Sequence, residues 1–283
     1  MQNKKTLCAK AVKNDEFYTR YEDVKTECDN YRSHFFNKII YCNCDTVNSA
    51  FVRYFSELKD KGLIRDIWFS GGLGGADFRS PESIERLKQA DLIITNPPFS
   101  LFREFMDLLI QYDKKFLVIG NFNAVKYKNI FPLIKENKLW IGTRPFGGAI
   151  SMIFNVPDEK QLIESGKHYI MLGGKAMAQI PATWFTNLYH AKQKPLILSK
   201  RYHGNESMYP KYDNADVINV DRKTNIPIDY YGVMGIPITF IDRYNKNHFE
   251  ILGLDKDFTN DGNGAILKGR HLYGRIFIRR LTQ

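Results

Sequence analysis

Apolar residues in the first 165 positions alternate between short continuous runs and helically spaced sets. The runs lie within residues 38–42, 63–69, 92–94 and 115–120, and only the one at 63–69 is interrupted, by Arg65 and Asp66. Such runs are typical of strands buried on both faces of a parallel sheet. Apolar spacing of three and four predicts amphipathic helices at residues 46–61, 81–90 and 102–109. Strands that alternate with helices predict an α/β fold on a largely parallel sheet.

The pattern of apolar and polar positions changes after residue 165. Short alternating segments predict strands at residues 182–186, 217–220 and 238–241, and residues 268–280 are expected to form a basic hairpin. Before this change, residues 139–141 and 149–156 predict another hairpin around a turn with Gly and Pro. We therefore expect one domain over residues 1–165 and a second region over residues 166–283.

The loop after residues 92–94 carries the clearest chemical signal. Pro97 and Pro98 lack an amide hydrogen and have a restricted φ, so they end the strand and leave a rigid loop at its carboxyl end. Open α/β sheets bind their ligands at that edge. The Asn96 side-chain oxygen and the Pro97 carbonyl can each accept one hydrogen of an aromatic amine, while the Phe99 ring stacks on the base. A Pro-Pro turn with Phe99 in the core is the alternative.

Composition favours an anionic partner, because 41 Lys and Arg against 31 Asp and Glu give a net charge of +10. Residues 1–165 contain 24 basic and 21 acidic residues, and residues 166–283 contain 17 and 10, so most of the excess lies in the second region. The four cysteines lack the spacing of a zinc site or a secreted disulfide framework, and no apolar run reaches membrane-spanning length. We expect reduced thiols, no bound metal and a cytoplasmic protein without membrane contact.

Several separated motifs resemble those of one enzyme family. They are Glu16-Phe17-Tyr18-Thr19, Tyr41-Cys42-Asn43-Cys44-Asp45, Asn96-Pro97-Pro98-Phe99, Lys211-Tyr212-Asp213-Asn214, Gly232-Val233-Met234-Gly235-Ile236-Pro237 and Phe249-Glu250-Ile251-Leu252-Gly253. In this order they resemble the EcoRI-type adenine-specific DNA methyltransferase family, from about residue 14 to the end. The resemblance implies a doubly wound, mostly parallel, Rossmann-like core that binds S-adenosylmethionine, and a smaller mixed α/β C-terminal region that recognises DNA. It assigns catalysis to Asn96, Pro97, Pro98 and Phe99.

The resemblance also assigns residues to the cofactor. Thr19 would donate to its carboxylate with Phe17 packed alongside, although Thr19 is equally placed to cap a helix. Asn43 and Asp45 would bind it from a turn without glycine, the Asp45 anion near the cofactor's ammonium group. An Asx-turn that caps the next helix is the alternative for this turn. Asp77 would accept the adenine amine of the cofactor, and Phe78 would pack on its ring.

Double-stranded DNA is the partner that the resemblance implies. Phe146 would sandwich the extruded base, and Lys200, Arg201, Lys268 and Arg270 would contact phosphates, although a solvated face is the plainer interpretation of each charged run. The expected reaction is methyl transfer to the 6-amino group of a flipped-out adenine, by a monomer in a bacterial or phage-infected cell. An RNA or protein-glutamine methyltransferase with a similar loop, and an inactive DNA-binding relative, remain alternatives here.

Overall fold

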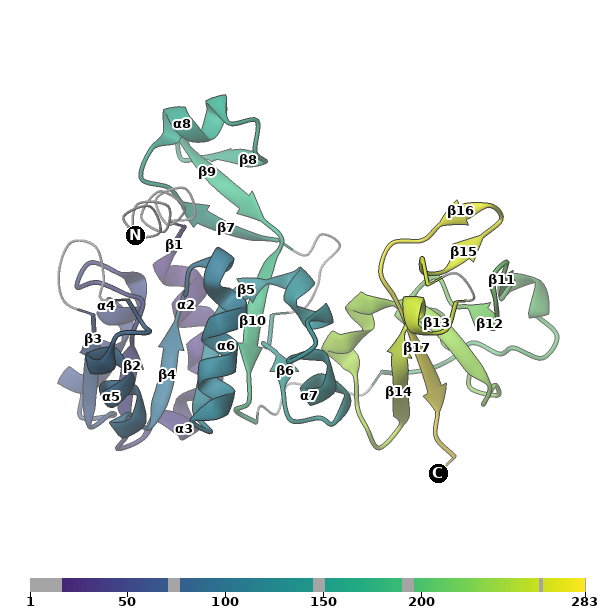
Figure 1. Ribbon diagram of the computed structural model, residues 1–283, viewed down its shortest axis with the longest axis horizontal. Helices are drawn as coiled ribbons and strands as arrows, with labels where there is room; N and C mark the ends of the chain where they lie inside the picture. Colours follow the sequence, from purple (N-terminus) through teal and green to yellow (C-terminus); the bar gives the residue numbers. More distant parts are fainter. Residues whose placement is uncertain (1–16, 71–76, 145–150, 190–195, 260–261, 283) are drawn as a thin grey trace, which may run out of the picture. The chain divides into compact units, whose positions relative to one another are not determined.

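The computed structural model describes residues 17–70, 77–144, 151–189, 196–259 and 262–282. The chain divides into two compact units, Met1–Ile130 with Leu139–His190 and Phe131–Lys138 with Ala191–Gln283. Both units combine helices with β-sheets (Figure 1), which confirms the α/β prediction. The expected division at residue 165 into a catalytic domain and a target-recognition region stays a prediction, and the compact units divide the chain elsewhere.

A six-stranded sheet forms the centre of the first unit. Its strand order is β3 (Asp66–Phe69), β2 (Ile39–Cys42), β4 (Leu92–Thr95), β5 (Lys115–Asn121), β10 (Ala182–Thr186) and β6 (Trp140–Ile141). β2 is parallel to both β3 and β4, and β4 is parallel to β5, whereas β10 is antiparallel to β5 and β6. The chain thus moves to one side of β2 and then to the other, so the carboxyl ends of β2 and β4 meet where such sheets bind ligands.

Helices precede the first parallel strand and alternate with the later ones. They are α2 (Tyr21–Cys28), α3 (Arg32–Phe35), α4 (Ala50–Asp60), α5 (Pro81–Gln89) and α6 (Phe102–Gln111), with the 3-10 helices η1 (Asp29–Tyr31), η2 (Phe99–Leu101) and η3 (Phe122–Lys126). Side chains that accept backbone hydrogen bonds start two of the helices. Ser49 accepts from the Val52 N–H at α4, and Ser80 accepts from the Ser83 N–H at α5. Pro81 is the first residue of α5, where its missing N–H costs nothing.

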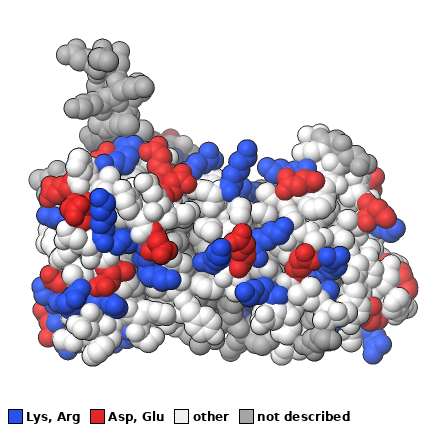
Figure 2. Space-filling model, turned by 60° about the horizontal axis from the view of Figure 1, so that its bottom comes forward, with Lys and Arg blue, Asp and Glu red and all other residues white. Residues whose placement is uncertain are grey.

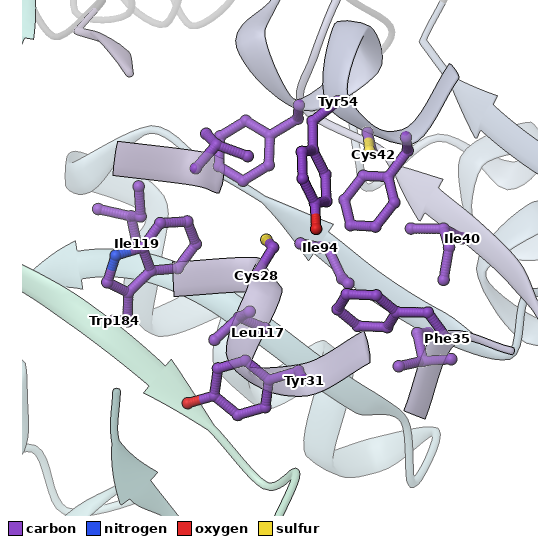
Figure 3. Close-up of a cluster of buried hydrophobic side chains, with 14 of the residues drawn as sticks. Cys28, Tyr31, Phe35, Ile40, Cys42, Tyr54, Ile94, Leu117, Ile119 and Trp184 are labelled. Carbon is purple, nitrogen blue, oxygen red and sulfur yellow. The ribbon is translucent and has the colours of Figure 1, made fainter. Parts of the chain in front are cut away.

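The main hydrophobic core lies on one face of this sheet. Figure 3 shows side chains of the first helices, such as Phe35 and Tyr54, packed over alternate strand residues that include Ile94 and Leu117. The intervening residues Tyr41 and Ile93 are also buried. On their side of the sheet, Phe102 of α6 lies 5.2 Å from Phe185 of β10, ring centre to ring centre. Burial of both faces explains why these strands are continuous apolar runs in the sequence.

A second sheet of the same unit is antiparallel. Its strand order is β1 (Tyr18–Thr19), β7 (Met152–Asn155), β9 (Lys175–Ile180) and β8 (Tyr169–Leu172), with α8 (Glu159–Glu164) between β7 and β8. The hairpin expected over residues 139–156 is wrong, because β6 pairs with β10 whereas β7 pairs with β1 and β9. Both strands were recognised, but each has a partner that is distant in sequence.

A buried carboxylate joins α2 to the segment that follows β6. Glu27 is 2% exposed and accepts hydrogen bonds from the Thr143 backbone N–H at 2.6 Å, the Thr143 hydroxyl at 2.9 Å and the Tyr31 hydroxyl at 3.0 Å. Burial raises the pKa of Glu27, and these hydrogen bonds oppose that rise. The carboxylate thereby ties together two residues that are 116 positions apart.

The second unit contains a five-stranded sheet and a two-stranded one. The larger has the order β11 (Lys211–Tyr212), β12 (Ala215–Asn219), β13 (Val233–Pro237), β17 (Arg275–Arg280) and β14 (Phe249–Leu254), and the smaller pairs β15 (Ile266–Leu267) with β16 (Arg270–His271). The other elements are α7 (Phe131–Lys135), η4 (Glu206–Met208), η5 (Lys223–Asn225), η6 (Ile238–Arg243) and η7 (Asp255–Asp257). Helix α7 belongs to this unit because Lys135 donates to the Leu252 carbonyl and its own carbonyl accepts from the Tyr244 hydroxyl.

Two strand predictions for this unit are wrong. Residues 238–241 form part of η6, because Pro237 ends β13 and the chain turns into a 3-10 helix. Residues 268–280 do not form one hairpin, since β16 pairs with β15 whereas β17 pairs with β13 and β14. The strand predicted at residues 182–186 is confirmed as β10.

Truncation of the main core should destabilise the first unit strongly. Leu117→Ala removes a side chain that is 0% exposed and leaves a cavity, so we expect a loss of about 2–5 kcal/mol in the free energy of unfolding. Ile110→Ala on α6 is the control, because Ile110 is 40% exposed and should cost no more than about 1 kcal/mol. Urea unfolding followed by tryptophan fluorescence measures both, and equal losses would contradict this account of the core.

Candidate active site

Three loops meet at the carboxyl ends of β2, β3 and β4. The Ser70 hydroxyl, after β3, donates to the Asn43 carbonyl at 2.7 Å, after β2. The Cys44 N–H donates to the Thr95 hydroxyl oxygen at 3.1 Å, and that hydroxyl donates to Asp45 Oδ2 at 2.5 Å. The turn after β2 and the end of β4 are therefore joined by hydrogen bonds, and the three loops form one continuous edge.

The Asn96 side chain has a defined orientation at this edge. Its Nδ2 donates to the Phe17 carbonyl at 2.7 Å, and a carbonyl can only accept, so the contacting atom is the amide nitrogen. The Asn96 Oδ1 atom is buried and has no hydrogen-bond partner among the residues that the structure describes. After it, Pro97 is buried and Pro98 precedes η2, whose first residue is Phe99. The loop thus presents one unsatisfied acceptor on a rigid backbone.

Three aromatic rings surround this loop. The Phe99 ring centre lies 5.8 Å from that of Phe17 and 6.0 Å from that of Phe154, and the Phe17 and Phe154 centres are 5.9 Å apart. Phe99 and Phe17 are partly exposed, so neither ring is sealed in the core. The Lys167 ammonium group lies 5.8 Å from the Phe17 ring centre. Phe17, which the resemblance assigns to the cofactor, and Phe99, which it assigns to catalysis, therefore lie side by side.

Two further buried polar atoms lack a partner at the same edge. The Thr19 hydroxyl and the Asn43 Nδ2 atom have none within the described ranges, as is the case for Asn96 Oδ1. Buried polar atoms in native proteins almost always form hydrogen bonds, because an unsatisfied one costs about 1–3 kcal/mol. Three such atoms on the segments that the sequence assigns to ligand binding fit a polar ligand with donors and acceptors of its own.

Asp45 is the most perturbed carboxyl group at this edge. Burial raises its pKa to about 7, although hydrogen bonds from the Thr95 and Ser49 side chains and from the Asn96 backbone act in the opposite direction. Asp45 in turn raises the pKa of the buried Cys42 thiol and of the half-buried Cys44 thiol, for both of which desolvation is the larger cause. A positive group beside Asp45 would therefore be bound most tightly when the carboxyl is ionised.

Asp77 and Phe78 have other contacts. The Asp77 carboxylate is exposed and takes a two-pronged ion pair with Arg79, whose guanidinium also contacts Glu104 at 3.0 Å. This pair lowers the pKa of Asp77. Phe78 is 4% exposed, with its ring centre 5.1 Å from that of Phe105. Asp77 nevertheless lies near the turn after β2, because its charge contributes to the raised pKa of Cys44, behind burial and the charge of Asp45.

Two alternatives from the sequence are wrong, and one residue cannot be placed. Thr19 does not cap α2, because Arg20 occupies the N-cap position. The turn at residues 43–45 does not cap α4, because Ser49 does. Phe146 lies outside the described residues.

Sequence reasoning missed three participants. Thr95 had a usable signal, because it is the one polar residue of a strand that is buried throughout. Phe154 and Lys167 had none, since each reaches the edge from the antiparallel sheet or its connections.

Among the described residues, no group of three or more His, Cys, Asp or Glu could hold a metal ion. No helix in the described part of the chain is long and apolar enough to cross a membrane.

The fold and this edge are consistent with a methyltransferase, and comparison with known proteins identifies its family. The family described as adenine-specific methyltransferase EcoRI matches residues 6–70 and 59–280. The Type II methyltransferase M.EcoRI of Escherichia coli is 39% identical, over 98% of this chain and 96% of its own length. M.MgeORF184P of Mycoplasma genitalium is 38% identical and M.MpnI of Mycoplasma pneumoniae 35%, both Type II methyltransferases aligned over 96% of this chain and 97% of theirs. No solved structure matches.

The chain belongs to the EcoRI-type adenine-specific methyltransferase family and is a DNA adenine methyltransferase. The resemblance inferred from its motifs is thereby confirmed. The comparisons do not favour the alternatives, which were an RNA methyltransferase, a protein-glutamine methyltransferase and an inactive DNA-binding relative.

The raised pKa of Asp45 predicts a pH-dependent stability. The native carboxyl holds its proton up to about pH 7, whereas the unfolded one loses it near its ordinary value, about 3.9. The native state thus binds more protons between these values, and its stability falls as the pH rises through this window. Asp45→Asn removes the effect, so between pH 5 and pH 7 the wild type should lose roughly 2–3 kcal/mol relative to the variant.

Denaturant unfolding at both pH values measures this difference. Asp60→Asn at the exposed end of α4 is the control and should give no such divergence from wild type. A pH-independent gap between wild type and Asp45→Asn would show that the carboxyl ionises at the same pH in both states.

Proposed function

We propose that this enzyme binds S-adenosylmethionine at the carboxyl edge of β2, β3 and β4 and methylates the 6-amino group of an adenine flipped out of duplex DNA. The core sheet is then the doubly wound, Rossmann-like sheet of such enzymes. The observation that carries the proposal is the unpaired Asn96 Oδ1 atom, held in place by the bond from its own amide nitrogen to Phe17. When bound, the cofactor supplies a methyl group on a sulfonium ion, which needs no separate activation.

The other unpaired atoms fit the polar end of that cofactor. The Thr19 hydroxyl can donate to a carboxylate, and the Asn43 Nδ2 atom is a second donor. Asp45, once ionised, attracts an ammonium group, and Phe17 offers an apolar wall. The assignment of Asp77 and Phe78 to the cofactor's adenine stays a prediction. The Asp77 carboxylate is ion-paired with Arg79, so a contact with the adenine amine would be made beside this pair or in its place.

Asn96 and Pro97 would hold the target amine by its two hydrogens. An amine conjugated to a purine ring is a poor nucleophile, since its lone pair is delocalised into the ring. Acceptance of both hydrogens, by Asn96 Oδ1 and the Pro97 carbonyl, draws the nitrogen toward a pyramidal geometry and aims the lone pair at the methyl group. The partly exposed Phe99 ring would stack on the base, while Pro98 keeps the backbone rigid. The adenine must leave the helix, because a paired amine cannot reach this edge.

DNA recognition would fall to residues 166–283, and residues 1–165 would carry the chemistry. Charge alone does not define a binding face, because Figure 2 shows Lys and Arg side chains interspersed with Asp and Glu on the face that it presents. The cations of the second unit that form no ion pair with a described acidic residue include Lys200, Arg201, Lys268 and Arg270, all exposed. By contrast, Lys211, Lys223 and Arg279 are paired with acidic residues.

Lys268 carries a second signal. It adopts a φ of +49° at the turn between β15 and β16, followed by Gly269 at +71°. Two positive φ values suit a tight hairpin turn, but a lysine there is strained, and such strain tends to be retained where the side chain has a use. A phosphate contact from this tip would supply one. An enzyme that acts on bacterial or phage DNA would work in the cytoplasm.

Asn96→Ala tests the catalytic assignment. The variant keeps the two prolines but loses the acceptor, so we expect methyl transfer to DNA to fall by at least about 100-fold, with cofactor affinity largely retained. Single-turnover transfer of labelled methyl groups and calorimetric titration with S-adenosylmethionine measure the two quantities. Asn187→Ala is the matched control, because this asparagine bridges the Phe116 N–H and the Lys114 carbonyl away from the edge. Near-normal turnover in Asn96→Ala would refute the proposal.

Lys268→Asn tests the DNA contact. Asparagine tolerates a positive φ, so the turn should survive while one phosphate contact is lost. The slope of log affinity for duplex DNA against log salt should become shallower by about 0.9, with no change in base preference. Lys211→Asn, which removes a lysine paired with Asp216, should leave the slope near that of wild type. An unchanged slope in Lys268→Asn would remove this residue from the DNA interface.

A further inference from the structure

We propose that Thr95 and Asp45 are positioning residues, whose hydrogen-bonded side chains lock the backbone of Asn96 to the turn after β2 so that the cofactor turn and the amine acceptor move as one unit. The inference rests on the proposed role of Asn96. It adds Thr95 and gives Asp45 a second role beside the one proposed toward the cofactor's ammonium group, and neither residue contacts a reacting atom. It concerns the alignment of the methyl donor with the amine rather than the binding of either.

The Thr95 hydroxyl donates one hydrogen bond and accepts another. It has a single proton, which it donates to Asp45 Oδ2 at 2.5 Å, and its oxygen accepts from the Cys44 N–H at 3.1 Å. Thr95 is 0% exposed, so water does not compete for either bond. These two bonds, which we call the relay, therefore connect the end of β4 to two successive residues of the turn after β2.

Asp45 extends this relay to the catalytic residue. Its carboxylate also accepts from the Asn96 backbone N–H and from the Ser49 side chain at the start of α4. Asn96 is consequently held at two points, its backbone N–H by Asp45 and its Nδ2 by the Phe17 carbonyl. Its remaining polar side-chain atom, Oδ1, is the one that the proposed chemistry requires, so the two anchors determine where that atom points.

A threonine at position 95 suggests that its hydroxyl has a positioning role. Valine has nearly the same shape and would suit a buried strand without the cost of burying a hydroxyl. The sheet contains a natural comparison in Thr186 of β10, also 0% exposed, whose hydroxyl donates to the Phe116 carbonyl at 2.7 Å and accepts from the Leu188 N–H. Thr186 joins two strand ends by the same kind of bonds, but it lies away from the catalytic edge. A comparison of variants at the two threonines therefore distinguishes a structural role from a positioning role.

The test compares Thr95→Val, Thr95→Ser and Thr186→Val in the full chain. Three quantities are measured for each: the single-turnover rate of methyl transfer at saturating DNA and S-adenosylmethionine, the affinity for S-adenosylmethionine, and the melting temperature. We expect Thr95→Val to slow transfer roughly 10- to 100-fold through misalignment of the amine acceptor. Thr95→Ser restores the hydroxyl and should recover most of the rate. Thr186→Val should lower the melting temperature without slowing transfer.

Two results would overturn the inference: a normal single-turnover rate in Thr95→Val, or an equal slowing in Thr186→Val. Should Thr95→Val fail to fold, Asp45→Asn replaces it, assayed at saturating S-adenosylmethionine so that a weaker contact with the ammonium group does not limit the rate. Asparagine keeps one acceptor oxygen but loses the second, and a normal rate in that variant has the same meaning. Asn96→Ala, assayed in parallel, separates the two proposals. If Asn96→Ala is inactive while Thr95→Val is normal, only the positioning role fails; if Asn96→Ala is active, the assignment of the loop fails first.

Discussion

A strand that is buried on both faces can hold a polar side chain only if the protein itself supplies the hydrogen-bond partners. Strand β4 obeys this constraint at its last residue, where Thr95 finds Asp45 and the Cys44 N–H. Because β2 and β4 are parallel neighbours, the turn after one lies within reach of the end of the other. The prolines then prevent the strand from continuing, and the chain must leave the sheet at that point. The position of the Asn96 amide follows from these local requirements.

The fold could be predicted to the extent that its signals are local. The strands at residues 38–42, 92–94 and 115–120 were recognised from their apolar runs, because burial on both faces leaves no polar alternation to confuse them. Pairing was not recoverable in the same way. Strands β6 and β7 are near in sequence, yet each belongs to a different sheet. Which sheet edge is open to a strand depends on elements that can lie more than a hundred residues away, as β1 does from β7, and no local pattern records it.

The site divides along the same line. Asn96 is hydrogen-bonded to Phe17, and Asp45 is hydrogen-bonded to the residue before Asn96, whereas the roles that the motifs implied for these residues stay predictions. Their partners were less accessible to sequence reasoning, since Phe154 and Lys167 arrive from other elements. Asp45 shows the limit most clearly. Its charge suggested an ionic partner, but its hydrogen bonds to Thr95 and Asn96 can be seen only when the strand ends are placed side by side.

The buried Glu27 carboxylate has a consequence for how this methyltransferase can diverge. Its oxygens accept from Thr143 twice, once from the backbone N–H and once from the hydroxyl. A change at position 27 that removes the acceptors leaves both Thr143 donors without this partner, and a change at position 143 removes the hydroxyl donor from a buried acid. Either substitution alone therefore lowers the stability, and a matching change at the other position can restore it. Across descendants of this chain, the identities at these two positions should therefore covary, despite the 116 positions that separate them.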